Sequence, residues 1–73
     1  MPIYAVAEFI RKHTLVRIIL TKQAFYIKGN IIGFDQFFNL TVDNAVMVND
    51  AEEIELRRII LRGENIAFIR DEQ

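Results

Sequence analysis

The sequence predicts a mainly β fold, in which an N-terminal α-helix precedes a strongly bent, five-stranded antiparallel sheet that forms a small open barrel. Two observations lead to this prediction. An amphipathic stretch with a helical repeat opens the chain, and five apolar runs rich in β-branched residues follow it. The polar connections between these runs are short, which favours sequential antiparallel strands. Because the chain has 73 residues, we expect a single domain over residues 1–73.

The expected helix covers about residues 2–12. Pro2 suits the first turn of a helix, where a backbone N–H is not needed. The apolar residues behind it recur at the spacing of one helical face, and they are Ile3, Val6, Ala7 and Ile10. His13 and Thr14 are expected to end the helix. Tyr4 and Phe9 are interpreted as packing residues, as is Tyr26 further along the chain.

The expected strands cover residues 15–20, 25–34, 40–48, 54–61 and 66–69. Glycine inside a strand often marks a bulge or a bend, so we expect the second strand to curl strongly at Gly29. Alternation along the third strand assigns its side chains to two faces, with Leu40, Val42 and Asn44 on one face and Thr41, Asp43 and Ala45 on the other.

The first and last strands to join such a sheet leave open edges. Open edges recruit other chains unless they are charged or covered. The fourth strand carries Arg57 and Arg58, which we interpret as edge-protecting or interface residues, whereas the fifth strand is short and apolar. Pairing of the fourth strand of one copy with the fifth strand of another makes a head-to-tail contact. Repeated contacts of this kind close into a ring if the rotation allows it.

The composition excludes several classes of protein. The chain has no cysteine and a single histidine, so it offers no disulfide, no thiolate metal site and no nucleophile–base pair of the usual enzymatic kind. We expect no enzymatic activity, no bound metal and no cofactor. No apolar run approaches the ~20 residues of a membrane span, and no signal peptide is predicted.

Two further numbers bear on partners. Hydrophobic residues make up 52% of the chain, which is more than a small monomer hides easily, so part of this surface is expected to face other subunits. The net charge is −1, whereas a stand-alone binder of the phosphate backbone usually carries a basic excess. Binding of RNA would therefore depend on a few well-placed groups that are repeated around an assembly.

The connection from Gly33 to Leu40 combines chemistry that packing alone does not require. It places aromatic side chains, the carboxylate of Asp35 and the amide of Asn39 within one short loop. An aromatic face and a fixed amide together suit a flat ligand, since the ring stacks and the amide bonds an edge. Taken singly, Phe37 could instead be a core aromatic, Asp35 an ordinary turn residue and Arg62 a solvated turn residue.

Two segments together resemble the signatures of the Sm and Sm-like RNA-binding family. The first is Ile-Gly-Phe-Asp-Gln-Phe-Phe-Asn-Leu-Thr-Val-Asp-Asn-Ala at residues 32–45, and the second is Ile-Ile-Leu-Arg-Gly-Glu-Asn-Ile at residues 59–66. The first signature lies within about residues 15–48 and the second within about 54–69. The chain departs from the family pattern at Arg57, where glycine is common, and at Phe38, where methionine is common.

The resemblance implies the fold described above and a ring, typically of seven subunits, that binds single-stranded, uridine-rich RNA. It also implies a role for each site residue. Phe37 resembles the aromatic that stacks on a base, and Asn39 the amide that bonds its edge. Asp35 resembles the carboxylate that orients this amide. Arg62 resembles the cation over the other face of the base, and Gly63 the turn beside it, for which we expect a positive φ.

Three functions stay open from the sequence. The first is a non-catalytic ring subunit in the core of spliceosomal small nuclear ribonucleoproteins, acting in pre-mRNA splicing in the nucleus and cytoplasm. The second is a Sm-like ring subunit in RNA decay or RNA chaperoning. The third is a structural ring subunit whose own loop contacts no RNA. In all three, the expected protein partners are other Sm or Sm-like subunits.

Overall fold

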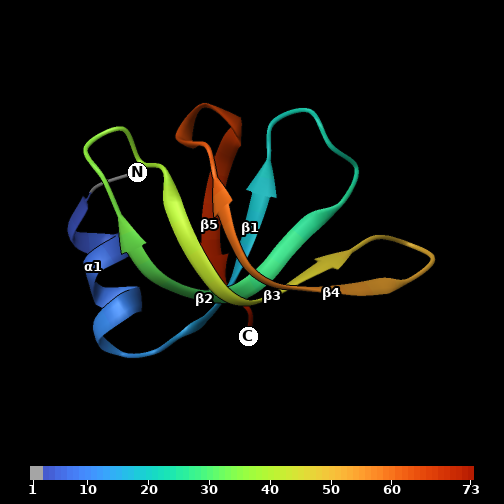
Figure 1. Ribbon diagram of the computed structural model, residues 1–73, viewed down its shortest axis with the longest axis horizontal. Helices are drawn as coiled ribbons and strands as arrows, with labels where there is room; N and C mark the ends of the chain where they lie inside the picture. The colour runs from blue at the N-terminus through green and yellow to red at the C-terminus, as the bar shows by residue number, and fades with distance from the viewer. Residues whose placement is uncertain (1–2) are drawn as a thin grey trace.

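The computed structural model describes residues 3–73 and contains one helix that lies against a bent antiparallel sheet (Figure 1). The elements are α1 (Ile3–Arg11), β1 (Leu15–Leu20), β2 (Tyr26–Phe34), β3 (Leu40–Val48), β4 (Glu53–Leu61), the short 3-10 helix η1 (Gly63–Asn65) and β5 (Ile66–Asp71). The predicted fold class is confirmed.

The predicted role of Pro2 lies outside the described residues. Within the described residues, no helix is long and apolar enough to cross a membrane.

Helix α1 ends where the sequence predicts, and its end is tightly capped. His13 adopts a left-handed conformation with φ of 53°. Its N–H donates to the carbonyl of Ile10 at 3.1 Å, and the N–H of Thr14 donates to the carbonyl of Phe9 at 3.0 Å. These two bonds form a Schellman motif, which satisfies the last carbonyls of the helix.

Only a narrow stripe of α1 faces the sheet. Val6 is fully buried, and Phe9 and Ile10 pack against the core. Ala7 is exposed, and the Tyr4 side chain is 73% exposed. The prediction that these two residues pack inside is therefore wrong, because the nine-residue helix rests on the sheet along one line and its other faces meet solvent.

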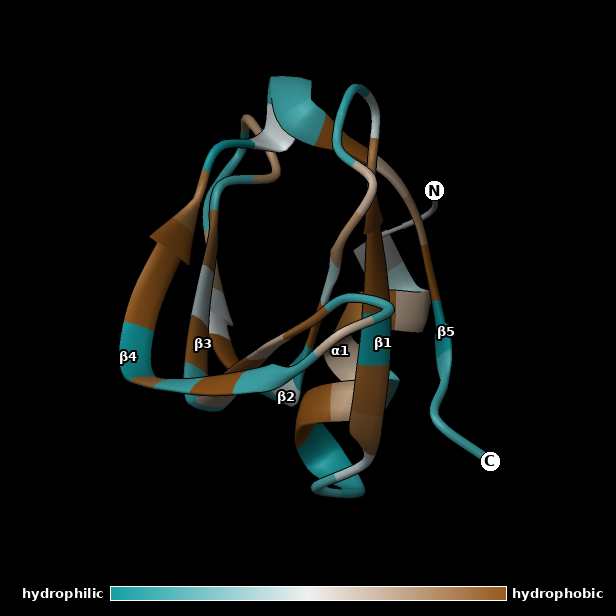
Figure 2. Cartoon of the chain, turned by 90° about the vertical axis from the view of Figure 1, so that its right-hand side faces the viewer, coloured by the Kyte–Doolittle hydropathy of each residue, from teal (hydrophilic) through white to brown (hydrophobic). Residues whose placement is uncertain are grey.

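The sheet has the order β4-β3-β2-β1-β5, with every neighbouring pair antiparallel. Figure 2 shows β4 at one margin and β5 at the other, so the two edge strands are those that the sequence predicts. Inward side chains of the helix, of the three middle strands and of the edge strand β5 form one core, which consists of Val6, Val16, Ile18, Leu20, Ile27, Ile31, Leu40, Val42, Ala45 and Ile69.

The bend in β2 depends on the absence of a side chain at Gly29. The β2–β3 register shifts between Lys28 and Asn30, on either side of this glycine. A Cβ at Gly29 would lie 2.7 Å from the Val42 side chain and 2.9 Å from the Asp43 carbonyl oxygen. Both distances are too short for a real contact, so only glycine lets β3 pass this closely. The structure thus agrees with the predicted bend at Gly29.

Strand β3 contains a bulge that changes which residues face the core. Asn44 adopts a φ of 53° and is exposed, while Ala45 is buried. The predicted alternation is therefore wrong from Asn44 onward, because the left-handed residue shifts the inward positions by one. The amide of Asn44 donates to Asn30 Oδ1 at 3.1 Å, and Asn30 Nδ2 lies 3.3 Å from the carbonyl oxygen of Thr14. These bonds tie the bulge to the end of the helix.

Arg57 lies opposite this bulge and also has a left-handed backbone. Its φ is 69°, and its partner across the β3–β4 pair is Ala45. A residue with a Cβ is strained in this conformation by roughly 1–2 kcal/mol, whereas glycine is not. Arg57, which stands where the family pattern commonly has glycine, is thus a strained residue in an edge strand.

We predict that Arg57→Gly is at least as stable as the native chain. Release of the left-handed strain offsets the roughly 0.5–1 kcal/mol that glycine costs through the unfolded chain. Arg58→Gly is the matched control, because Arg58 has no positive φ and pairs with Asp43 at 3.3 Å. Urea unfolding at one fixed protein concentration should give Arg58→Gly a free energy of unfolding about 1 kcal/mol lower than that of Arg57→Gly. Equal losses in the two variants would show that Arg57 carries no strain.

Candidate nucleic-acid interface

The loop between β2 and β3 is folded around the carboxylate of Asp35. One oxygen, Oδ1, accepts hydrogen bonds from the backbone N–H groups of Phe37 at 2.8 Å and Asn39 at 3.1 Å. The Phe38 N–H donates to the Asp35 carbonyl at 3.0 Å, which closes a turn. Aspartate is favoured at such positions because its short side chain bonds the backbone that follows it. The loop is therefore a fixed structure.

The two aromatic residues at the tip of this loop point in different directions. Phe38 has a φ of 61° and packs against the core. Phe37 is 70% exposed. The left-handed residue reverses the chain, so that one ring anchors the loop while the other is presented to solvent. The alternative that Phe37 is a core aromatic is thus wrong for this chain.

The side chain of Asn39 joins this loop to the β4–β5 connection. Its Nδ2 donates to Asp35 Oδ2 at 2.9 Å, and its Oδ1 accepts the backbone N–H of Gly63 at 2.9 Å. A carboxylate only accepts hydrogen bonds and a backbone N–H only donates them, so these two partners determine the positions of the oxygen and the nitrogen of the Asn39 amide. The amide is held in one orientation by Asp35 in its own loop and by Gly63, which is 24 residues further along the sequence than Asn39.

Gly63 is required by a close approach and not by its dihedral angles. No glycine in the described part of the chain has a positive φ, so the expected left-handed turn at Gly63 is wrong. A Cβ at this position would overlap the carbonyl oxygen of Phe37 and lie 2.9 Å from the carbonyl group of Phe38. The backbones of the two loops touch here, and any side chain would separate them.

Arg62 precedes this contact and extends into solvent. Its side chain is 67% exposed, and its guanidinium lies 4.0 Å from the Glu64 carboxylate, which is a weak pairing. A pocket of about 680 Å³ lies between the two loops and β5, and its lining includes Phe37, Asn39, Arg62 and Gly63. Four of the five predicted site residues therefore surround one hollow, and the fifth, Asp35, stands behind Asn39.

The surroundings of Asp35 favour its charged form. The hydrogen bond from the Asn39 amide is the largest cause that lowers the pKa of this carboxyl below its usual 3.8. Slight burial opposes this effect, while the N–H groups of Phe37 and Asn39 and the charge of Arg62 add to it. The carboxylate stays ionised at neutral pH, and the orientation of Asn39 depends on it.

Two features of the site have no clear signal in the sequence. The left-handed backbone at Phe38 is one, since a bulky residue is rarely found there. The bond from Gly63 to Asn39 is the other, because it forms only when the sheet brings the loops together. Across residues 3–73, no group of three or more potential metal ligands lies close enough to hold an ion.

Comparison with known proteins supports the resemblance seen in the two signatures. The family model described as the LSM domain matches residues 8–71. The chain is 39% identical over 71 residues to small nuclear ribonucleoprotein E of Schizosaccharomyces pombe, which covers 94% of this chain and 84% of that relative.

The fold is also found in solved structures of Sm proteins. A heptameric archaeal Sm protein superposes with a TM-score of 0.84 at 26% identity, over 96% of this chain and 98% of the other. The Pyrococcus abyssii Sm protein in complex with a uridine heptamer gives a TM-score of 0.83 at 28% identity, over 97% of each chain. On the match over residues 8–71 and these similarities, the chain belongs to the Sm and Sm-like family of proteins that share the LSM domain.

Proposed function

We propose that this chain is a non-catalytic subunit of a Sm-type ring that binds single-stranded, uridine-rich RNA. In this role it is a core component of spliceosomal small nuclear ribonucleoproteins in pre-mRNA splicing, present in the nucleus and the cytoplasm. The observation that carries the RNA-binding role is the fixed amide of Asn39 between Asp35 and Gly63, beside the exposed ring of Phe37.

The locked amide of Asn39 presents a pattern that matches uracil. Its Oδ1 keeps one lone pair after bonding Gly63, and its Nδ2 keeps one hydrogen after bonding Asp35. Uracil offers an N3–H donor beside an O4 acceptor, so it bonds both groups at once. A pair of bonds of this kind discriminates between bases by roughly 1–3 kcal/mol.

Cytosine has the opposite pattern, with an N3 acceptor beside an amino donor. To bind it, the amide of Asn39 would have to turn over. Its NH₂ group would then face the Gly63 N–H, and its oxygen would face the Asp35 carboxylate. Both contacts are repulsive, so the partners that fix Asn39 also select uracil over cytosine.

Phe37 and Arg62 supply the faces of the same site. A base stacked on an exposed ring gains roughly 1–3 kcal/mol, and a guanidinium on its other side adds to this. One such site is weak, but repetition around a ring makes the binding multivalent. A net charge of −1 is then no obstacle, because stacking and edge contacts replace a basic surface.

The relatives support the assembly and the cellular role. The archaeal neighbour is a heptamer, the Pyrococcus protein binds a uridine heptamer, and the yeast relative is named as a small nuclear ribonucleoprotein. We infer a ring of seven Sm or Sm-like subunits, in which the free edge of β4 pairs with the free edge of β5 of the next subunit. The exposed apolar residues of these edges, Ile60 at 70% and Phe68 at 51%, fit such a contact.

We predict that Phe37→Ala and Arg62→Ala each weaken oligouridine binding about tenfold, which corresponds to the loss of one stacking partner per site. Tyr4→Ala is the control, because it removes an equally exposed ring that lies outside the site. Native mass spectrometry with and without oligouridine reports assembly and binding together, and fluorescence anisotropy gives the affinities. Unchanged affinity in assembled Phe37→Ala and Arg62→Ala rings would leave only a structural role.

We predict that Asp35→Asn lowers the preference for oligouridine over oligocytidine several-fold. A neutral amide at residue 35 tolerates the turned Asn39 side chain, so half of the barrier to cytosine is lost. Asp50→Asn, an exposed turn residue outside the site, makes the same charge change and should keep the native preference. Competition between the two oligomers measures this ratio directly. A native ratio in Asp35→Asn would show that the carboxylate does not set the specificity.

The depressed pKa of Asp35 predicts how the loop responds to acid. Because the folded pKa lies below 3.8, the carboxylate stabilises the folded loop fully above pH 3.8, and this contribution is lost as the pH falls through the lower folded value. The side-chain NH₂ resonances of Asn39 should therefore stay constant from neutral pH to about pH 4 and shift only below it. A shift between pH 5 and 7 would contradict this prediction, and Asp35→Asn should abolish the acid shift.

A further inference from the structure

Three cations lie in one row across the face of the sheet opposite the core. Arg17 in β1 is the direct cross-strand partner of both Lys28 in β2 and Arg70 in β5. Its neighbours Val16 and Ile18 are buried, so Arg17 points to the other face. Like charges directly opposite one another in a sheet are destabilising. An anion over the centre of this cation row would therefore reduce the repulsion between the three side chains.

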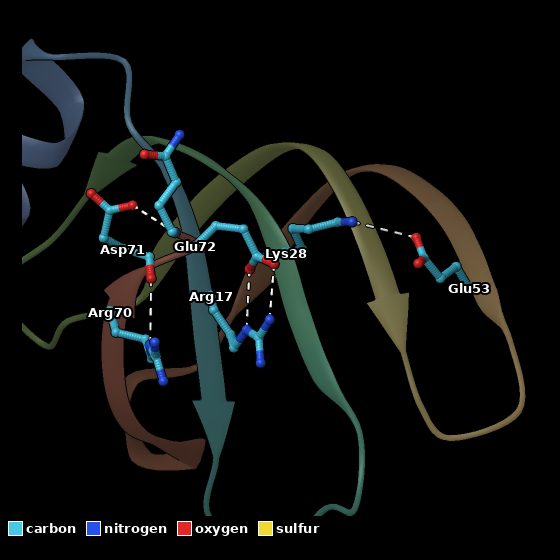
Figure 3. Close-up of polar contacts among 7 residues, drawn as sticks. Arg17, Lys28, Glu53, Arg70, Asp71 and Glu72 are labelled. Atoms are coloured by element: carbon cyan, nitrogen blue, oxygen red, sulfur yellow. Dashed lines mark hydrogen bonds and ion pairs between the residues drawn. The ribbon is translucent and has the colours of Figure 1, made fainter.

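Glu72 supplies that anion, as Figure 3 shows. Its two carboxylate oxygens lie 2.9 Å from Arg17 Nη2 and 3.1 Å from Arg17 Nε. The hydrogen bond from Arg17 lowers the pKa of Glu72, and the charges of Lys28 and Arg70 add to this effect against slight burial. All three members of the cation row thus act on one carboxylate.

The ring of Tyr26 stacks on one face of the Arg17 guanidinium and holds it in place, while the N–H groups at the edge of the guanidinium bind Glu72. The central carbon of the guanidinium lies 4.2 Å from the centre of the Tyr26 ring, within the range of a cation–π contact. A stacked, planar guanidinium presents its N–H groups as a fixed fork that matches carboxylate and phosphate oxygens alike. The geometry that binds the Glu72 carboxylate would bind a phosphate group equally well.

The carboxylate of Glu72 can leave the row at little structural cost. Strand β5 ends at Asp71, and the backbone N–H of Glu72 donates to the Leu15 carbonyl at 3.0 Å. Rotation of the side chain leaves that bond intact. Lys28 has only a loose partner, Glu53 at 3.4 Å, and Arg70 makes no ion pair with any residue in the described range 3–73.

We propose that the cation row of Arg17, Lys28 and Arg70 is a second RNA contact, which binds the phosphate backbone and is occupied by Glu72 in the free protein. This inference rests on the proposed function, because its ligand is the same single-stranded RNA. The net acidic chain carries nine lysine and arginine residues, and three of them are gathered here, away from the Phe37–Arg62 pocket. Phosphate is favoured over a base, since the row offers charge and forked N–H donors and its one aromatic ring is covered by Arg17.

The test is the salt dependence of oligouridine binding by the assembled protein. Each phosphate contact of a single strand adds about 0.7 to the slope of log affinity against log salt concentration. Glu72→Gln should bind more tightly at low salt, with a slope steeper by about 0.7. Glu52→Gln is the matched control, because it makes the same charge change at an exposed turn residue that forms no ion pair with any residue from 3 to 73. Equal behaviour of the two variants would overturn the proposal.

Two more variants separate this inference from the proposed base site. Arg70→Gln changes a residue that is exposed in the single chain but lies in β5, the strand inferred to join the next subunit, so native mass spectrometry first checks that the variant assembles. In the assembled variant the salt slope should be flatter, while the preference for uridine over cytidine stays native. Phe37→Ala should do the reverse, weakening uridine binding without a change of slope. An unchanged slope in Arg70→Gln refutes the cation row alone, whereas unchanged binding in Phe37→Ala refutes the base site alone.

Discussion

The close passage of β3 over Gly29 is the constraint on which the rest of this structure depends. A single sheet encloses a core only if it bends over itself, and a Cβ at Gly29 would collide with Val42 and with the Asp43 carbonyl. With the bend in place, Val42 and Leu40 are fully buried in the same core as Ile18 of β1. The core is small, so each of these contacts is a large share of the stability of the domain.

The pairing of β3 with β4 brings the two loops of the candidate site together, because Leu40 at the start of β3 lies opposite Leu61 at the end of β4. Phe37 lies in the connection between β2 and β3 and Gly63 in the connection between β4 and β5, and the backbones of the two connections touch. The contact allows the Gly63 N–H to reach Asn39 Oδ1, and this bond, together with Asp35, fixes the amide. The fixed orientation of Asn39, from which we propose the selectivity for uracil, is thus a consequence of the β3–β4 register.

The strained residues mark the places where the fold overrides local preference. His13, Phe38, Asn44 and Arg57 all have a positive φ, and none of them is glycine. The left-handed backbone at Phe38 reverses the loop so that Phe37 is exposed, and the one at Asn44 places Ala45 in the core. Arg57 faces that bulge from an edge strand. Such strain persists only where surrounding contacts over-determine the backbone. These places are the capped end of α1 at His13, the loop of the site at Phe38, and the β3–β4 bulge at Asn44 and Arg57.

The cation row is a local cluster of positive charge in a chain whose net charge is −1. Arg17, Lys28 and Arg70 are far apart in the sequence and unremarkable there, because each is a lone basic residue in a strand. The register of three strands sets them side by side, and Glu72 balances them. The row and the Phe37–Arg62 pocket are thus two different surfaces, which we propose to bind phosphate and a base respectively.

The sequence by itself determined the helix, the five strands and the two edge strands, and its two signatures indicated the five residues of the candidate site. These features follow from apolar periodicity and from short motifs, which are local properties of the chain. The exposure of Tyr4, the shifted faces after Asn44, the negative φ of Gly63 and the lock on Asn39 were decided only by the tertiary structure. Each of these depends on how segments that are distant in the sequence pack on one another, and no pattern along one segment contains that information.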